Sequence, residues 1–553
     1  MQTQVTDSPS PTTTAPIEDN AGYSILKTLR NYGVDAIFGI PGTHNLEFYR
    51  HLVPMGIRPV TTRHEQGAGY GADGWAQQTG LPGVVITTSG PGLLNALSAA
   101  GTAYCESRPL IILSPGVPEG EEFADIGSLH ETKDPTAATG AIVEWSRRVH
   151  SGTEAVRAVH DAFELFRYGR PRPVHIEVPL NVLEGATDCP VELLEAKPVR
   201  AGQAAGAAEL RTAADLLRAA ARPVILAGGG SIRAGADLAA LAELLQAPVV
   251  TTLNGKGAVP ESHPLSLGSD IRLPAAQGLC NDADVLLIIG SKVGESELWG
   301  GKITPRGSVL RMDILATQAH KNVSADVALI GDAAVVVPQL VTELGMLNRP
   351  EADIKAVRET LRGQARALSP VLSRIAEEAA SVLPAGTIVG GDSSQITYLG
   401  TASFIPQDLP HSLLYTPAYA TLGYGLPASI GAKVGAPGRA VVCILGDGAL
   451  MFAVQEMMTA VEQGIDLVVV CVDNGGYAEI RANEEDRGIA PVGVDLAQPD
   501  WAALASAFGG TGHTLESAAD FAPTLRKALN SRGLQLLHVP VGLFATTSPE
   551  TTN

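Results

Sequence analysis

The chain has 553 residues, 45% of them apolar, which is enough for several domains with full hydrophobic cores. Its 39 Lys and Arg stand against 58 Asp and Glu, and this net charge of −19 disfavours binding to nucleic acid or an anionic membrane. No apolar run reaches the length of a membrane span. The five cysteines are odd in number and form no Cys-x-x-Cys pair, so we expect reduced thiols and a cytoplasmic protein.

The order of apolar runs predicts three similar domains. In each domain short apolar strands alternate with helices, which is typical of a doubly wound α/β fold with a mainly parallel sheet. The first residues are rich in Thr, Ser, Pro and acidic side chains and lack the pattern of a signal peptide. The expected segments are a disordered tail (1–20), an N-terminal domain (21–183), a linker (184–208), a central domain (209–344), a helical stretch (351–380) and a C-terminal domain (365–545).

Polar residues gather where strands of the N-terminal domain are expected to end. Thr43 and His44 follow the strand at 36–40, and the segment 89–95 follows the strand at 83–87. Glu65 opens a helix between these two turns, where favourable interaction with the helix dipole is an ordinary explanation for a glutamate. A role for Glu65 in a site at this edge of the sheet stays open from these residues alone.

The segment 441–477 reads as strand, glycine turn, helix and strand. Apolar residues recur at helical spacing from Leu450 to Val461, which predicts one helix there. In a right-handed crossover both strands end at the same edge of the sheet, so we expect Asp447 and Asn474 to be neighbours. Their oxygens beside a helix start suit Mg²⁺ that holds a diphosphate, although an ordinary α/β unit with a solvated aspartate would look similar.

Two better-known glycine motifs do not fit this segment. A Walker loop needs Gly-Lys-Ser/Thr after the turn, and none follows Gly448. The dinucleotide fingerprint Gly-x-Gly-x-x-Gly fails because Met451 occupies the third glycine position. A nicotinamide-dependent dehydrogenase is therefore disfavoured.

The segment instead resembles the thiamine diphosphate motif of 2-oxo acid decarboxylases and acetolactate synthases. The resemblance implies Asp447, the Asn474 side chain and the Gly476 carbonyl as ligands of Mg²⁺, with Asp473 in place of an asparagine of the motif. It also implies that Leu422, in a matching segment at 421–427, supports the bent cofactor. Further cofactor-binding residues implied are Ser393, Gln395, Gly446, Gly448, Ala449 and Tyr477.

The N-terminal motifs resemble the pyrimidine side of the same family. Residues 63–68, followed by 72–76, match one of its motifs, and the segment from Ser89 to Asn95 matches the next. The resemblance implies that thiamine diphosphate reacts through a carbanion at its thiazolium C2. Glu65 then binds the far ring nitrogen of the pyrimidine and favours the tautomer that removes the C2 proton.

In acetolactate synthases the central domain carries FAD beside an arginine-rich segment. This chain has the segment 291–297 at the corresponding place, and it contains no arginine. We therefore predict no FAD. The glycine triplet 228–230 is a weak sign of a nucleotide site, because neither its spacing nor an acidic residue at the ribose-binding distance fits.

Departures from acetolactate synthases indicate the reaction. They have Phe-Gln-Glu where this chain has Leu129-His130-Glu131, and Gly-Gln-His where this chain has Ser394-Gln395-Ile396. The segments 42–45, 129–134 and 391–395 resemble the branch that contains 5-guanidino-2-oxopentanoate decarboxylase, which implies non-oxidative decarboxylation of a 2-oxo acid to an aldehyde. Glu297, Glu479 or Glu484 could bind a guanidinium group. An acetolactate synthase-type carboligase and a non-catalytic cofactor-binding homologue remain alternatives.

Proton donors and assembly are also implied. His44 and His130 are candidate proton donors, and Thr43 matches a proton-relay position, although both histidines could be ordinary loop residues.

In the resembled family the two halves of the cofactor site come from different subunits. We therefore expect a homo-oligomer, a dimer or a tetramer, that acts on a small-molecule 2-oxo acid.

Overall fold

The computed structural model describes residues 19–545. Most of the predicted tail, residues 1–18, lies outside the described residues. Asn20 belongs to the predicted tail but is buried, and its side chain accepts a hydrogen bond from the Tyr23 amide (2.8 Å) at the start of α1 (Ala21–Asn31). The expectation of disorder is therefore wrong for Asn20, which caps the first helix.

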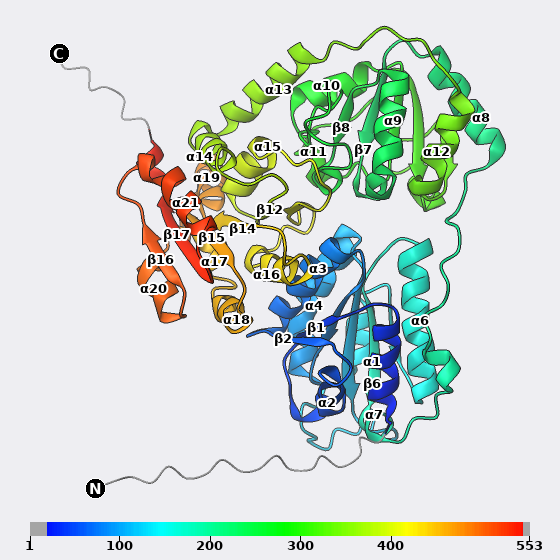
Figure 1. Ribbon diagram of the computed structural model, residues 1–553, viewed down its shortest axis with the longest axis vertical. Helices are drawn as coiled ribbons and strands as arrows, with labels where there is room; N and C mark the ends of the chain where they lie inside the picture. The colour runs from blue at the N-terminus through cyan, green and yellow to red at the C-terminus, as the bar shows by residue number, and fades with distance from the viewer. Residues whose placement is uncertain (1–18, 546–553) are drawn as a thin grey trace.

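The N-terminal domain is a six-stranded parallel sheet with helices on both faces (Figure 1). Its strand order is β2-β1-β3-β4-β6-β5. The strands are β1 (Ala36–Gly39), β2 (Arg58–Thr61), β3 (Gly83–Ile86), β4 (Leu110–Gly116), β5 (Trp145–Arg148) and β6 (Val174–Pro179). The helices that follow the first strands and help form the site are η1 (Thr43–Asn45), α2 (Leu46–Leu52), α3 (Glu65–Thr79), α4 (Pro91–Glu106) and α5 (Pro135–Gly140). The helices α6 (Gly152–Tyr168) and α7 (Leu180–Glu184) complete the domain.

The central domain has a five-stranded parallel sheet, ordered β11-β10-β9-β7-β8. The strands are β7 (Pro223–Ala227), β8 (Val249–Thr251), β9 (Val285–Ile289), β10 (Ser308–Asp313) and β11 (Val327–Ile330). Helices around this sheet include α8 (Ala207–Ala219), α9 (Gly235–Leu245), α10 (Pro274–Asp282), α11 (Glu295–Leu298) and α12 (Ala333–Leu344). The chain between the two domains contains a short 3-10 helix, Val191–Leu194.

The C-terminal domain repeats the strand order of the N-terminal domain. Its sheet runs β13-β12-β14-β15-β17-β16, which is the N-terminal order with each strand number raised by 11. The strands are β12 (Ile388–Gly390), β13 (Leu413–Leu414), β14 (Val441–Gly446), β15 (Leu467–Asp473), β16 (Thr511–Thr514) and β17 (Leu534–Pro540). Its helices include α16 (Gly425–Gly435), α17 (Asp447–Leu450), α18 (Glu456–Glu462), α19 (Ala478–Asp486), α20 (Trp501–Ala507) and α21 (Phe521–Leu529). The prediction of an α/β chain with three doubly wound domains is confirmed.

Two predicted helices are interrupted. The helix expected over 450–461 ends at Leu450, and α18 starts only at Glu456, because Met451 and Phe452 turn out of the core and are about half exposed. The stretch at 351–380 divides at Pro370 into α13 (Lys355–Leu368) and α14 (Pro370–Ala380). Proline cannot continue the ladder of the preceding helix, and Ser369 caps the new one through the Leu372 amide (3.3 Å).

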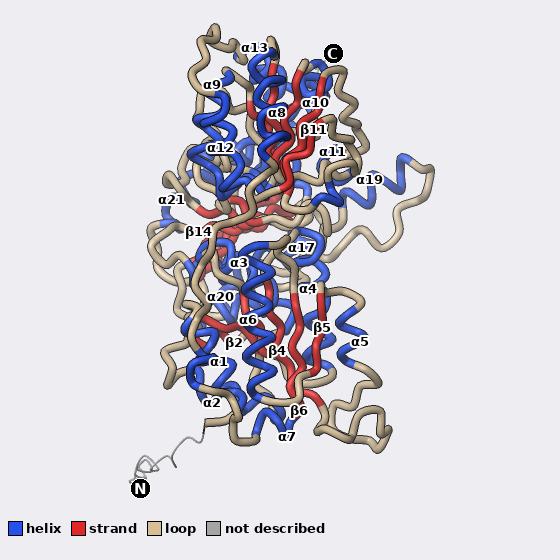
Figure 2. The backbone as a smooth tube through the Cα atoms, turned by 90° about the vertical axis from the view of Figure 1, so that its right-hand side faces the viewer, coloured by secondary structure: helices blue, strands red, loops and turns tan. Residues whose placement is uncertain are grey.

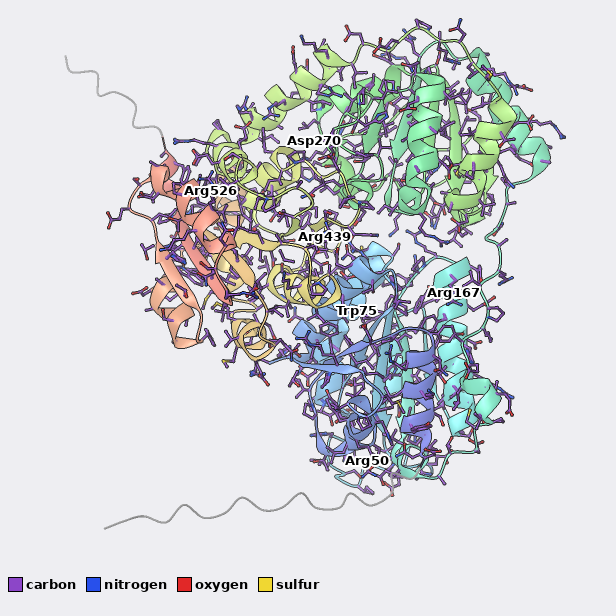
Figure 3. The ribbon with its side chains drawn as sticks, in the orientation of Figure 1. Arg50, Trp75, Arg167, Asp270, Arg439 and Arg526 are labelled. Atoms are coloured by element: carbon purple, nitrogen blue, oxygen red, sulfur yellow. The ribbon has the colours of Figure 1, made fainter. Side chains whose placement is uncertain are left out.

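The N- and C-terminal domains of one chain pack through α3 and α16 (Figure 1). The two backbones approach so closely that a Cβ on Gly431 would lie 1.8 Å from the Gly71 carbonyl oxygen. Trp75 lies at this contact and is buried (Figure 3). Among residues 19–545 no helix has both the length and the apolar character needed to cross a bilayer.

Candidate active site

Four loops of the N-terminal domain converge at the carboxyl edge of its sheet. Thr43 and His44 follow β1, Glu65 follows β2, the helix that carries Asn95 follows β3, and the loop that carries His130 follows β4. Parallel sheets place ligands at this edge, beside the point where the strand order reverses. In this sheet that point is the neighbouring pair β1 and β3.

Glu65 is the first residue of α3 and is only 8% exposed. Its Oε2 accepts a hydrogen bond from Asn95 Nδ2 at 3.0 Å. Within residues 19–545 its Oε1 has no hydrogen-bond partner, and a Cβ on Gly92 would lie 3.1 Å from that atom. The Thr88 hydroxyl nearby is buried and also lacks a partner in this part of the chain. A ring nitrogen of a bound pyrimidine would find an acceptor or donor at Oε1, so these residues fit that half of thiamine diphosphate.

His44 and His130 lie together around one serine hydroxyl. Their rings are 5.4 Å apart between centroids, and both Nδ1 atoms approach Ser89 Oγ, at 2.6 Å from His44 and 3.4 Å from His130. Burial lowers the pKa of His44, and the neighbouring His130 lowers it further. Ser89 belongs to a motif that the sequence predicts, but only the structure reveals its hydroxyl between the two rings.

The loops that carry these histidines are held by side chains. Asn45 is fully buried and ties the turn after β1 by accepting from the Gly42 amide (2.8 Å) and donating to the Ile40 carbonyl (3.0 Å). His130 has a φ of 62°, and Gly90 faces it so closely that a Cβ there would lie 2.4 Å from the His130 carbonyl oxygen. Thr43, in contrast, is exposed and makes no side-chain hydrogen bond within residues 19–545.

Three oxygens converge at the carboxyl edge of the C-terminal sheet. Asp447 begins α17 after β14, and Asn474 follows β15. The backbone amide of Asn474 donates to Asp447 Oδ1 at 3.4 Å, so the prediction that these residues are neighbours is confirmed. With its side-chain oxygen turned inward, Asn474 places Oδ1 3.0 Å from the Gly476 carbonyl oxygen and 3.2 Å from Asp447 Oδ1. Asn474 Nδ2 then donates outward to Gln395 Oε1 at 3.3 Å.

This spacing matches the edge of an octahedral cation site. Mg²⁺ takes oxygen ligands at 2.0–2.1 Å, so neighbouring ligands stand about 3 Å apart. Without a cation, an inward amide nitrogen would instead donate to both oxygens. The carboxylate of Asp447, the amide oxygen of Asn474 and the carbonyl of Gly476 are therefore chemically suited to hold Mg²⁺.

Side chains that the sequence does not reveal orient Asp447. Gln498 Nε2 donates to Asp447 Oδ2 at 2.6 Å, and the Trp501 indole donates to Gln498 Oε1 at 3.2 Å. Asp447 is buried, which raises its pKa, and the nearby Asp473 raises that pKa further. Gln498 leaves Oδ1 of Asp447 free to face the other two oxygens. No sequence signal marks Gln498, because it lies 51 residues from Asp447 in a loop.

The glycine turn and its neighbours form a cradle around this oxygen triplet. Ser394 Oγ accepts from the Gly446 amide at 3.1 Å, and Ala449 is buried in α17. The Tyr477 ring covers Gly448, where a Cβ would lie 3.0 Å from Cε1 of the ring. Backbone amides at the start of a helix beside a cation suit a diphosphate.

Asp392 braces the segment that carries Leu422. The carboxylate is fully buried and accepts hydrogen bonds from the amides of Ser393 (2.9 Å), Gly423 (3.2 Å) and Gly425 (2.8 Å). Burial raises the pKa of Asp392 to about 7. Leu422 lies next to Gly423, which has a φ of 86°, so its position depends on a turn that the carboxylate fixes.

The three glutamates considered for a cationic substrate lie in different places. Glu479, at the start of the exposed helix α19, accepts from Gln395 Nε2 (3.0 Å) and the Tyr398 hydroxyl (3.2 Å). Gln395 in turn contacts Asn474, so Glu479 is one side chain away from the oxygen triplet. Glu484 lies farther along α19, the helix that projects in Figure 2, and accepts from the Val492 amide (3.2 Å). Glu297 lies in the central domain.

The two groups of residues do not meet within one chain. Among residues 19–545 no hydrogen bond or ion pair joins Glu65, His44 or His130 to Asp447 or Asn474. Besides the packing of α3 on α16, one contact between the two domains lies next to Glu65: the Glu456 carboxylate accepts from the amides of Arg63 and His64, both at 3.1 Å.

The chain contains a duplicated α/β domain. One copy carries a buried carboxylate, and the other carries an oxygen triplet beside a helix start. Together these features define a cofactor-dependent enzyme class. The chain matches three domains of thiamine pyrophosphate enzymes: the N-terminal binding domain (19–137), the central domain (210–340) and the C-terminal binding domain (396–539). It therefore belongs to the thiamine diphosphate-dependent family of 2-oxo acid decarboxylases and acetolactate synthases.

Curated relatives carry two kinds of name. The chain is 37% identical to the probable 2-ketoarginine decarboxylase AruI of Pseudomonas aeruginosa, over 94% of this chain and 93% of the relative. It is 32% identical to a probable acetolactate synthase large subunit of Methanocaldococcus jannaschii (94% and 91% covered). It is 31% identical to the acetolactate synthase of Arthrospira platensis (94% and 93% covered). The comparisons thus show an enzyme family in which both decarboxylation and carboligation occur.

Proposed function

We propose that this protein is a thiamine diphosphate- and Mg²⁺-dependent decarboxylase of a 2-oxo acid with a cationic tail, of the 5-guanidino-2-oxopentanoate class. The observation that carries the substrate class is the position of Glu479. Its carboxylate is held by Gln395 and Tyr398 and is linked through Gln395 to Asn474. A guanidinium group binds a carboxylate with two parallel hydrogen bonds, so an acidic side chain linked through Gln395 to Asn474 would select a substrate with a cationic tail. The name of the Pseudomonas relative agrees with this substrate class.

The chain's own residues divide the work between two half-sites. Asp447, Asn474 and Gly476 would hold Mg²⁺ and through it the diphosphate, while Glu65 would bind the pyrimidine ring. Bound thiamine diphosphate supplies the electron sink that lets the bond between C1 and C2 of the 2-oxo acid break, with loss of CO₂. His44 or His130 would then deliver a proton to the former carbonyl carbon, which leaves an aldehyde.

The environment of the histidines supports this role. A proton donor must hold its proton within reach of the carbon and recover it afterwards. Ser89 contacts both imidazoles and can pass a proton between them, so that one ring can resupply the other.

Carboligation of the acetolactate synthase type is the second candidate, because relatives with that name match most of the chain at 30–32% identity. In that reaction a second carbonyl compound takes the place of the proton. A non-catalytic homologue is a third, and the complete set of Glu65, Asp447 and Asn474 argues against it.

Product analysis by mass spectrometry separates these candidates. The enzyme would be incubated with thiamine diphosphate, Mg²⁺ and either 5-guanidino-2-oxopentanoate, 2-oxohexanoate or pyruvate. We expect 4-guanidinobutanal from the first substrate at a kcat/KM at least tenfold above the neutral 2-oxohexanoate. Glu479→Gln should remove most of that preference, whereas Glu485→Gln, on the same exposed helix, should keep it. Acetolactate from pyruvate at an equal or higher rate would contradict the proposal.

A further inference from the structure

A half-exposed tryptophan of the central domain lies against the C-terminal domain. Trp299 directly follows the short helix α11 and is 46% exposed. Its ring packs edge to face against the Tyr398 ring, with 5.6 Å between the ring centroids and 76° between the ring planes. Tyr398 lies in the helical turn Ile396–Thr401 of the C-terminal domain. The two rings therefore form a corner of aromatic surface to which two domains contribute.

The hydroxyl of Tyr398 connects this aromatic corner to Glu479. It donates to Glu479 Oε2 at 3.2 Å, and Gln395 Nε2 donates to the same oxygen at 3.0 Å. Burial raises the pKa of Tyr398 and the charge of Glu479 raises it further, so the hydroxyl keeps its proton and remains a donor. Across residues 19–545, Oε1 of Glu479 has no hydrogen-bond partner. That oxygen can therefore accept from a ligand beside the two rings.

The backbone of Trp299 has a conformation that bulky residues rarely adopt. Its φ is 49° and its ψ is 52°, in the left-handed region where glycine ordinarily ends a helix. Gly300 follows directly and has a φ of 75°. Residues held in such sparsely populated conformations cluster at active sites and at sites that clamp ligands. The strained position of a large aromatic side chain beside Tyr398 thus points to a function for the Trp299 ring.

The Trp299 ring already stacks on a guanidinium of its own chain. Arg272 is 6% exposed, and its Cζ lies over the Trp299 ring at 4.4 Å from the centroid. Its guanidinium donates to the Tyr398 carbonyl and to Ser403 Oγ (2.8 Å). Asp270, labelled in Figure 3, lies 3.4 Å from the same guanidinium and offsets its charge. Because Trp299 is half exposed beyond this contact, its ring has surface left for a second cation.

We propose that Trp299, Tyr398 and Glu479 form a guanidinium cage, in which Glu479 binds the N–H edge of the substrate's tail and the Trp299 ring covers its planar face. This inference rests on the proposed function, in which Glu479 selects a substrate with a cationic tail. Aromatic rings attract cations to their faces, and aromatic cages recognise organic cations in this way. Trp299 is thereby a specificity-determining residue that the central domain contributes.

The cage makes a distinction that a carboxylate alone does not make. Glu479 by itself would pair with any cationic tail. A guanidinium is planar and less strongly hydrated than an ammonium, so it can stack on the Trp299 ring while its edge binds the carboxylate. We therefore expect the enzyme to prefer a guanidino tail to an amino tail, and we expect this preference to depend on Trp299.

Calorimetric titration of 5-guanidinopentanoate into the full-length protein, loaded with thiamine diphosphate and Mg²⁺, tests the cage. This acid lacks the 2-oxo group, so it can bind without being decarboxylated. We expect it to bind about tenfold tighter than hexanoate and also tighter than 6-aminohexanoate. Trp299→Leu should weaken the binding of 5-guanidinopentanoate about fivefold and leave that of hexanoate unchanged. Trp299→Phe keeps an aromatic face and should recover most of the loss.

Trp145→Leu is the matched control. Trp145 also stacks on an arginine, with Arg147 Cζ 4.1 Å from its ring centroid, but it lies on β5 of the N-terminal domain. This variant should bind both acids as the parent does. A variant with both Trp299→Leu and Glu479→Gln should lose less affinity than the product of the two single losses, because both side chains hold one group. Independent losses would put Trp299 and Glu479 at separate sites and overturn the cage.

Failure of the cage and failure of the proposed function give different results. If aldehyde forms and Trp299→Leu keeps the full preference for the guanidino substrate, the cage is wrong and the proposed decarboxylation stands. If binding of 5-guanidinopentanoate depends on Trp299 but no aldehyde forms, the cage stands and the proposed decarboxylation is wrong. Equal binding of 5-guanidinopentanoate and hexanoate by the parent would overturn the cage.

Fluorescence gives a second measurement in case Trp299→Leu does not fold. Binding of 5-guanidinopentanoate should quench tryptophan emission in the parent, and this change should be absent in Trp299→Phe. Trp75 and Trp501 are buried, so the ligand does not reach their rings. The same quenching in Trp299→Phe as in the parent would overturn the cage.

Discussion

The N- and C-terminal domains have the same strand order but use their strand ends differently. After its second strand the N-terminal domain carries Glu65, near the Thr88 hydroxyl, which has no partner in the described part of the chain. After its third and fourth strands the C-terminal domain carries Asp447 and Asn474 beside a helix start. One framework thus supports an acid that we propose to bind a neutral ring and an acid that we propose to bind a metal, and the difference lies in a few loop residues.

The two domains also brace their first loops differently. Asn45, a neutral amide, fixes the turn after β1, and Asp392, an acid that follows β12, holds the segment that carries Leu422. The N-terminal brace cannot change its charge, whereas burial raises the pKa of the C-terminal brace to about 7. Substitutions at Asn45 and Asp392 can therefore show whether the charge of the side chain affects the stability of each domain.

The largest expected effect is at Glu65. Glu65→Gln should keep the hydrogen bond with Asn95, and therefore the local structure, while kcat falls by about 10²–10⁴-fold because the acid is lost. Steady-state assays measure kcat, and calorimetric titration of thiamine diphosphate measures whether the variant still binds the cofactor. Glu359→Gln, on the exposed face of α13, is the control. If Glu65→Gln keeps its turnover, Glu65 does not have the proposed role toward the pyrimidine ring, and the proposed contrast between Glu65 and Asp447 is wrong.

A smaller effect is expected at Gln498, which orients Asp447, the acid proposed to bind the metal. Gln498→Ala should raise the Mg²⁺ concentration for half-maximal activity by about 10–100-fold, because residues that orient metal ligands contribute on that scale. Saturating Mg²⁺ should restore most of kcat. Ser506→Ala, on the neighbouring helix α20, should leave the Mg²⁺ dependence unchanged. An unaltered dependence in Gln498→Ala would show that Asp447 is not a ligand of the metal.

Local sequence patterns predict the strand ends and the residues on them. The right-handed crossover from β14 to β15 is enough to predict that Asp447 and Asn474 are neighbours, and the hydrogen bond between them agrees with that prediction. Gln498 escapes prediction because its contact spans 51 residues and no periodicity encodes it. The break before Glu456 escapes prediction too, because the apolar spacing continues through Met451 and Phe452 although both side chains are half exposed.

The pH dependence of stability should distinguish the two braces. Since the pKa of Asp392 is higher in the folded chain than its ordinary 3.8, its ionisation opposes folding as pH rises from about 4 to 7. That contribution is about 1.4 kcal/mol per unit of pKa shift. Asp392→Asn cannot ionise, so its free energy of unfolding in urea should vary less between pH 4.5 and 7.5 than that of the parent. Asn45→Asp should add a pH dependence in the N-terminal domain, and equal slopes in all three proteins would contradict this account.

The smallest expected effect concerns the two histidines. The pKa of His44 is lowered by burial and by His130, so its protonated form is lost at a lower pH than usual. If His44 donates a proton, kcat/KM falls as pH rises through that pKa. His130→Gln removes a like charge and should move this decline to higher pH, by less than about one unit. His150→Gln, an exposed histidine paired with Glu119, should not move it.

The contact between Glu456 and the start of α3 has a genetic consequence. It fastens the segment before Glu65 to the C-terminal domain of the same polypeptide, and across residues 19–545 no hydrogen bond or ion pair joins Glu65 to Asp447. If two copies pair so that each lends one half to its neighbour, a strain that expresses Glu65→Gln and Asp447→Asn from separate alleles would regain function by complementation. Each mixed pair would hold one intact centre and one that carries both lesions.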